Sequence, residues 1–222
     1  MRFAEQRTAL AKAAARLAAG GLTHGSGGNL SVRADDLVIL TPSGCALETV
    51  TAEQMVVVDL DGRVAEPTPY RPTSELRIHL DIYRTTPARA VAHAHPVASI
   101  AVANTADELP AVHYTAAMLG GAIRVAPYAV FGSDELRDAV RDALRDRTAA
   151  LMRNHGSVAY GDTLDIACAH LELVDWLARI HLAAPGGATL DATALTEVVQ
   201  TALARHYTPF GPESTTPAGS DL

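Results

Sequence analysis

The chain has 222 residues, of which 48% are hydrophobic and 19% charged, so it can bury the core of one α/β domain. Its formal net charge of −7 argues against a nucleic-acid-binding protein, because such proteins need a basic face. Two cysteines without a CxxC motif and the lack of a long apolar run predict a cytoplasmic protein with reduced thiols and no membrane partner.

The first half of the chain predicts two helices separated by short strands. Residues 2–19 are Ala-rich with leucines on a helical repeat, and Gly20-Gly21 ends this helix. A glycine-rich loop then leads into a hairpin, a third strand and a second helix, at 25–29, 30–41, 55–59 and 73–83. For the second helix we expect a hydroxyl of Thr73-Ser74 as the N-cap and Glu75 in the first turn.

The second half interleaves strands and helices. Short apolar strands are expected at 90–95, 123–125, 149–152 and 157–160, and helices at 97–103, 133–145, 162–183 and 191–206. This order favours an α/β protein with a central mixed, mainly antiparallel sheet covered by helices over a doubly wound parallel sheet. We expect one domain over residues 1–210, followed by a disordered tail at 211–222 that is rich in Pro, Ser, Thr and Gly.

Histidines in two places predict a metal site. His93 and His95 are two residues apart at the end of a predicted strand, so both side chains project from one face and can grip a divalent ion. His155 lies in a tight turn, Asn154-His155-Gly156. Three imidazoles with an open position are typical of catalytic zinc. The spacing alone leaves open a structural role for each histidine, because it does not bring the two segments together.

Glu75 has two interpretations. As a first-turn carboxylate it stabilises the dipole of the helix that follows. Beside a metal ion it could act as a general base and take a proton from a carbon next to a carbonyl group.

Three polar turns contain no Lys or Arg, and plain turn chemistry explains each by itself. Their glycine backbones and hydroxyl groups are also suited to hold a phosphate group, and one of them opens a helix, where an anion is favoured. These turns are Gly27-Gly28-Asn29, Ser43-Gly44 and Thr73-Ser74. Tyr114 and Tyr207 are candidates for proton donors, with a structural role as the alternative for each.

The motifs together resemble the class II aldolase/adducin family, and within it the L-fuculose-1-phosphate aldolases. The resemblance runs from Leu22 to about Val158. It rests on the stretches 25–33 (GSGGNLSVR), 41–44 (TPSG), 73–79 (TSELRIH), 91–95 (VAHAH), 111–114 (AVHY), 126–132 (APYAVFG) and 154–156 (NHG).

The resemblance implies an α/β/α fold and a site with one Zn²⁺ per subunit. His93, His95 and His155 correspond to the zinc ligands. Glu75 corresponds to the catalytic residue, which also binds the zinc when substrate is absent. The implied phosphate-binding residues are Gly28, Asn29, Ser43, Gly44, Thr73 and Ser74. Tyr114 and a C-terminal tyrosine, for which Tyr207 is the candidate, correspond to catalytic tyrosines. Homotetramers with the active site at a subunit interface are usual in the family, so both tyrosines would serve a neighbouring subunit.

The implied reaction is the reversible cleavage of a ketose 1-phosphate, such as L-fuculose 1-phosphate, to dihydroxyacetone phosphate and lactaldehyde through an enediolate. Glu75 favours the aldolase over a pentulose-phosphate 4-epimerase, in which an Asp is typical at this position. A dehydratase or a decarboxylase acting on a sugar phosphate stays open, because these relatives keep the same residues. A metal-free scaffold such as adducin has no reason to keep the complete set of histidines with Glu75.

Overall fold

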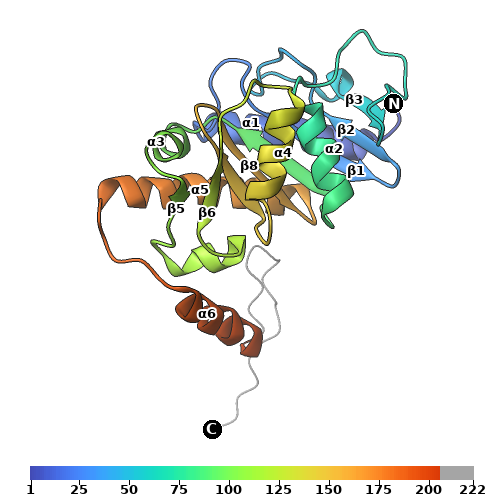
Figure 1. The fold of residues 1–222 in the computed structure, drawn as a ribbon. Coiled ribbons are helices and arrows are strands. Elements are labelled where there is room, and N and C mark those ends of the chain that lie inside the picture. Colours follow the sequence, from blue (N-terminus) through green and yellow to red (C-terminus); the bar gives the residue numbers. More distant parts are fainter. Residues whose placement is uncertain (206–222) are drawn as a thin grey trace.

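The computed structural model describes residues 1–205 and contains one eight-stranded sheet in the order β3-β2-β1-β4-β8-β7-β6-β5 (Figure 1). All neighbouring strands are antiparallel except β6 and β7, which are parallel. This confirms the expected mixed, mainly antiparallel sheet. The strands are β1 Asn29–Ala34, β2 Leu37–Leu40, β3 Val56–Asp59, β4 Ala90–Ala94, β5 Glu108–Leu109, β6 Ile123–Ala126, β7 Ala149–Met152 and β8 Gly156–Gly161.

Helices cover both faces of the sheet, so the layers are α/β/α (Figure 1). One core lies between the sheet and α1, α3 and α5, and includes Leu10, Val102 and Leu171. The second core lies between the other face and α2 and α4, and includes Ile78 and Val140. The α-helices are α1 Ala4–Ala19, α2 Leu76–Thr85, α3 Val97–Thr105, α4 Asp134–Ala143, α5 Leu164–Ala183 and α6 Ala192–Ala204, and the 3-10 helices are η1 Ala52–Gln54 and η2 Tyr114–Leu119.

The start of α2 differs from the sequence expectation. Glu75 occupies the N-cap position itself, without a side-chain cap, and the Thr73 hydroxyl accepts a hydrogen bond from the Glu75 N–H at 3.3 Å. The Glu75 carboxylate therefore points away from the helix amides and is available to other groups.

Three short elements, η1, β5 and η2, were not predicted, because three, two and six residues are too few to show a periodic pattern. Helix α6 lies beyond the layered body and packs on η2 (Figure 1).

Among residues 1–205 there is no helix with the length and apolar character needed to cross a membrane. The predicted tail at 211–222 and the end of the predicted domain at 210 lie outside the described residues.

Candidate metal centre and substrate pocket

Four side chains from three separate segments meet at one end of the central strands. The ligand atoms of Glu75, His93, His95 and His155 all lie within 4.8 Å of one another. The sequence alone could not show that the His93/His95 segment and the turn with His155 meet. They do meet in the fold, because β4 and β8 are neighbours and His93 pairs with Val158 in the sheet.

The sheet fixes the orientation of His93. This residue is buried in β4, and its Nδ1 lies 2.9 Å from the carbonyl oxygen of Ser157 on β8. A carbonyl oxygen only accepts hydrogen bonds, so Nδ1 carries the proton and Nε2 offers its lone pair to the centre of the cluster. The Nε2 atoms of His93 and His95 are 2.9 Å apart.

Glycines make room for His95. A Cβ atom on Gly27 would lie 2.5 Å from the Nδ1 of His95, and one on Gly156 would lie 2.3 Å from the carbonyl oxygen of Ala94. Both positions therefore accept glycine only, and the imidazole of His95 is held between two backbones.

The turn between β7 and β8 presents His155. Asn154 adopts a left-handed conformation with a φ of 54°, which Asn tolerates better than most residues. The side chain of Asn104 on α3 accepts a hydrogen bond from the Asn154 N–H at 2.8 Å. The turn is thereby tied to a helix, which positions the next residue, His155.

Glu75 bridges two of the imidazoles. Its Oε2 lies 2.9 Å from the Nε2 of His93 and its Oε1 lies 2.8 Å from the Nε2 of His155. Asn29 on β1 donates a further hydrogen bond to Oε2 at 2.8 Å. Glu75 is only 5% exposed, so this carboxylate depends on the cluster and on Asn29 for its stabilisation.

The pKa shifts within the cluster favour the binding of one cation. Burial alone would raise the pKa of Glu75, but His93 and His155 outweigh it and hold that pKa well below its ordinary value. Burial, together with His93 and His155, lowers the pKa of His95 to about 3. The site therefore presents an ionised carboxylate beside imidazole nitrogens that cannot all be protonated.

The donor set fits a divalent metal. Three imidazole nitrogens and one carboxylate are ligands that zinc commonly takes in a tetrahedral arrangement. The buried Oε1 of Glu75 has no geometrically satisfactory hydrogen bond, and it faces the same point as the histidine nitrogens. The assignment of these four residues as metal ligands stays a prediction that this geometry supports.

Gly156→Ala tests how tightly the cluster is packed. The new methyl group would meet backbone atoms that cannot move away, so we expect a loss of about 1–3 kcal/mol in the free energy of unfolding and weaker zinc binding. Denaturant unfolding and zinc titration measure the two effects. Gly187→Ala, the same change on an exposed turn, is the control. A Gly156→Ala variant as stable and as tight-binding as the wild type would refute the packing argument.

A pocket of about 440 Å³ opens over the metal cluster. Four of the predicted phosphate-binding residues line it, and none of its lining residues is Lys or Arg. An anion in this pocket would therefore meet only neutral donors and the metal cluster. The lining residues are Ser26, Gly27, Gly28, Asn29, Pro42, Thr73, Ser74, Glu75, His95, Tyr128, Ala129, Phe131, Asn154 and His155.

The remaining two predicted phosphate residues, Ser43 and Gly44, lie at the edge of this pocket and do not line it. Both are exposed, and the Ser43 N–H is already bonded to the carbonyl oxygen of Arg71 at 2.9 Å. A bridge between Pro42 and Pro72 ties this turn to the start of α2. The structure thus brings the turns together, and the phosphate assignments stay predictions.

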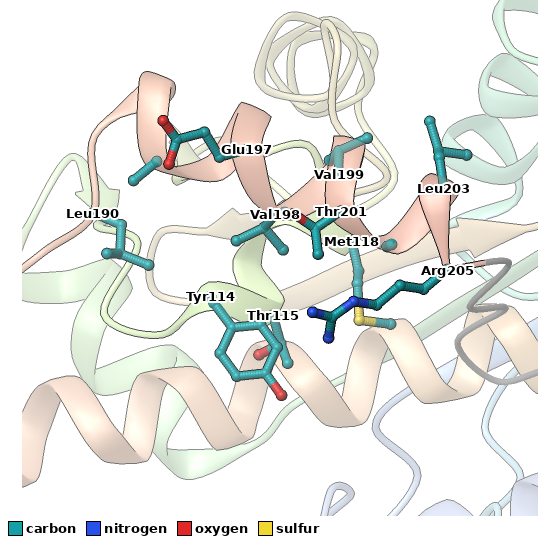
Figure 2. A pocket seen from close by; sticks show the side chains of 13 residues that line it. Tyr114, Thr115, Met118, Leu190, Glu197, Val198, Val199, Thr201, Leu203 and Arg205 are labelled. Atoms are coloured by element: carbon teal, nitrogen blue, oxygen red, sulfur yellow. The ribbon is translucent and has the colours of Figure 1, made fainter. Parts of the chain in front are cut away.

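Of the two predicted tyrosines, Tyr114 is among the described residues, and it does not line the pocket over the cluster. Tyr114 begins η2, is 56% exposed and lines a different pocket of about 950 Å³ between η2 and α6. In Figure 2 its ring lies below α6, together with Met118 and Arg205. Tyr207 lies outside the described residues. Within the described residues of one chain, Tyr114 is therefore not beside Glu75.

The stretch 126–132 carries part of the family resemblance, but no role was predicted for two aromatic residues within it. Tyr128 and Phe131 are 62% and 66% exposed in the loop before α4, and both line the cavity over the metal cluster. The available signal was two aromatic residues between Pro127 and Gly132 that no apolar periodicity explains. They add aromatic side chains to the lining of the pocket.

Comparison with known proteins assigns the chain to a family that includes metal-dependent enzymes, which agrees with the cluster of one Glu and three His. Residues 8–182 match the family described as the Class II Aldolase and Adducin N-terminal domain. The chain belongs to the class II aldolase/adducin family. It is 39% identical over 164 residues to an L-fuculose phosphate aldolase of Escherichia coli (strain K12), covering 73% of this chain and 75% of the relative.

Two further similarities agree with the family assignment. A 5-deoxy-D-ribulose 1-phosphate aldolase of Bacillus thuringiensis serovar kurstaki is 37% identical over 169 residues, covering 75% of this chain and 79% of the relative. A solved structure named L-fuculose 1-phosphate aldolase has a TM-score of 0.85 and 32% identity, covering 89% of this chain and 95% of that one. The expected family, fold and aldolase type of lyase are thereby confirmed. Class II aldolases depend on a metal, and the cluster of one Glu and three His could bind one.

Proposed function

We propose that this chain is a zinc-dependent aldolase that reversibly cleaves a ketose 1-phosphate into dihydroxyacetone phosphate and a small aldehyde. The observation that carries the proposal is the Glu75 carboxylate, buried among three imidazoles at the base of a pocket with polar turns. A carboxylate in this position can remove a proton from a carbon beside a carbonyl group.

His93, His95 and His155 would hold the ion, with Glu75 as a further ligand when no substrate is bound. A bound divalent ion would supply positive charge that stabilises negative charge developing on a substrate oxygen. The protein's part is to keep three imidazoles and one carboxylate facing one point, which the Ser157 carbonyl and the glycines at 27 and 156 do.

Glu75 would carry out the proton transfer. In the direction of synthesis, its carboxylate takes a proton from C3 of dihydroxyacetone phosphate. The electron pair of the broken C–H bond forms the C2–C3 double bond, and the C2 carbonyl oxygen takes up the negative charge. The resulting enediolate adds through C3 to the aldehyde carbon, whose oxygen receives a proton. Cleavage of the ketose phosphate is the reverse of these steps.

The phosphate group would lie at the polar end of the pocket. Gly28, Thr73 and Ser74 line this end, and the last two precede Glu75, the N-cap of α2, whose N-terminus favours an anion. Asn29, Ser43 and Gly44 complete the proposed set. The Asn29 amide is already bonded to Glu75 and His79, so its side chain contributes to phosphate binding only indirectly.

The proposed assembly is a homotetramer in the cytoplasm. In support of this, Tyr114 is exposed and lies outside the pocket over the metal cluster of its own chain. We propose that it donates the proton to the aldehyde oxygen of the neighbouring subunit, with Tyr207 as its partner.

A product assay tests the reaction. We expect dihydroxyacetone phosphate from L-fuculose 1-phosphate or from 5-deoxyribulose 1-phosphate, with lactaldehyde or acetaldehyde as the second product. L-Ribulose 5-phosphate is the control substrate, and its conversion to an epimer would favour the 4-epimerase instead. Absence of dihydroxyacetone phosphate with every ketose 1-phosphate, in protein loaded with zinc, would refute the proposal.

A further inference from the structure

Behind Glu75, a continuous set of buried polar side chains runs between β1 and α2. Asn29 and Ser31 are two residues apart on β1 and share one face of the strand. Glu75, His79 and Tyr83 follow one another at intervals of four and share one face of the helix. The proposed proton transfer uses only the first of these helix residues.

The contacts link all five side chains. Asn29 Nδ2 donates to Glu75 Oε2 at 2.8 Å, and Asn29 Oδ1 lies 2.5 Å from His79 Nε2. The Ser31 hydroxyl lies 2.7 Å from His79 Nδ1 and 2.6 Å from the Tyr83 hydroxyl. His79 and Ser31 are fully buried, so no water replaces a lost partner.

Only one arrangement of hydrogens satisfies this network. The ionised Glu75 only accepts, so Asn29 must turn its NH₂ group to it and its Oδ1 to His79. Asn29 Oδ1 is then an acceptor, so the His79 Nε2 atom, which lies 2.5 Å from it, must carry a hydrogen. Burial between the uncharged side chains of Asn29 and Ser31 favours the neutral ring, which has no second hydrogen for Nδ1.

The other nitrogen of the ring completes the order. His79 Nδ1, having no hydrogen, accepts from the Ser31 hydroxyl, and the Ser31 oxygen in turn accepts from the Tyr83 hydroxyl. Burial raises the pKa of Tyr83 above its ordinary value, so the phenol keeps its proton and remains a donor. Each donor thus meets an acceptor. The hydrogen bonds all point in one direction, from the Tyr83 hydroxyl to the Glu75 carboxylate.

We infer that His79 is a positioning residue, which fixes the Asn29 amide so that its N–H, rather than its oxygen, faces the base Glu75. The inference rests on the proposed role of Glu75. Without the His79 N–H, the amide is free to rotate, and its oxygen would then face the carboxylate as a second acceptor. Ser31 and Tyr83 act one step further away, because they fix the tautomer of His79.

Substitution of His79 separates this role from substrate binding. For His79→Phe, which keeps a ring and removes both hydrogen-bonding atoms, we expect C3 proton exchange of dihydroxyacetone phosphate to slow roughly 10- to 100-fold. Inhibition by inorganic phosphate should be unchanged, because His79 does not line the pocket. His79→Gln keeps a donor for Asn29 and should recover part of the rate.

Ile82→Val is the control for a loosened helix, because Ile82 is buried on α2 and does not belong to the network. It should lower stability and leave the exchange rate near that of the wild type. A His79→Phe rate equal to the wild-type rate would overturn the inference, and so would an Ile82→Val rate as low as that of His79→Phe.

Nitrogen NMR of the histidine rings reports the tautomer of His79 and tests the inference without an activity measurement. In ¹⁵N-labelled protein we expect the His79 ring in the neutral Nε2–H form at pH 6 to 8, and a mixture of tautomers in Ser31→Ala. A His79 ring in the Nδ1–H form would overturn the inference. Wild-type protein that exchanges no proton of dihydroxyacetone phosphate would instead refute the proposed function, and the tautomer would still decide the positioning role.

Discussion

Glu75→Gln is expected to slow C3 proton exchange of dihydroxyacetone phosphate by about 10²- to 10⁴-fold, the usual contribution of a general base. The amide has nearly the shape of the carboxylate and can still accept the hydrogen bond from Asn29. It has no basic oxygen, so it cannot take up the proton. The exchange of C3 hydrogen for solvent deuterium, followed by proton NMR, measures this step without the aldehyde.

Glu66→Gln is the matched control for this substitution. Glu66 is also a partly buried glutamate, but its carboxylate is paired with Arg7 at 2.7 Å and does not belong to the metal cluster. We expect its exchange rate to match that of the wild type. Zinc content and thermal unfolding of Glu75→Gln show whether the metal and the fold are kept. Unchanged exchange in a zinc-loaded Glu75→Gln protein would remove Glu75 from the role of base.

The main elements of the fold could be predicted because local signals mark them. Ser133 and Thr163 were expected at helix starts, and both side chains accept the capping hydrogen bond from an N–H three residues later.

At Glu75 the local capping signal did not predict the structure. A hydroxyl followed by Glu suggested a capped first turn, whereas the carboxylate is drawn to His93 and His155. Long-range charge interactions overrode the local preference at this position.

The cluster of His93, His95 and His155 followed from the sequence in part. The spacing of the first two on a strand gave a pair on one face, but their meeting with His155 depends on the pairing of β4 with β8. No local pattern contains that pairing. The resemblance to a family joined the candidates His155 and Glu75 to this pair, and the fold brings the ligand atoms of all four within 4.8 Å of one another.

The network behind Glu75 was missed for the same reason. The spacing of His79 and Tyr83 after Glu75 is visible in the sequence, yet it looks like the ordinary buried face of a helix. Its polar character becomes informative only when Asn29 and Ser31 of β1 lie opposite it. Such a network depends on the position of a helix relative to a strand whose contacting residues lie 46 to 52 positions earlier in the chain, which hydrophobic periodicity does not encode.

Removal of the metal is expected to abolish cleavage and synthesis, and added Zn²⁺ should restore them. The buried Glu75 carboxylate and the histidine nitrogens lose their common partner when the ion leaves, so stability should fall as well. An ion present at about 1,000 times its Kd stabilises a fold by about 4 kcal/mol. Metal analysis of protein purified without chelator should give one zinc per chain, and thermal unfolding with and without chelator measures the stabilisation.

His95→Ala locates this effect at the cluster. The pKa of the His95 imidazole is lowered to about 3, and its Nε2 lies 2.9 Å from the Nε2 of His93. Loss of the His95 side chain should remove one metal ligand without disturbing the sheet. We expect zinc affinity to fall by at least about tenfold and the chelator-sensitive part of the stability to disappear. His181→Ala, on the last turn of α5, should behave as the wild type. Because the fold of His95→Ala is expected to survive, a protein that binds zinc as tightly as the wild type, or whose activity withstands chelator, would contradict a catalytic metal at this cluster.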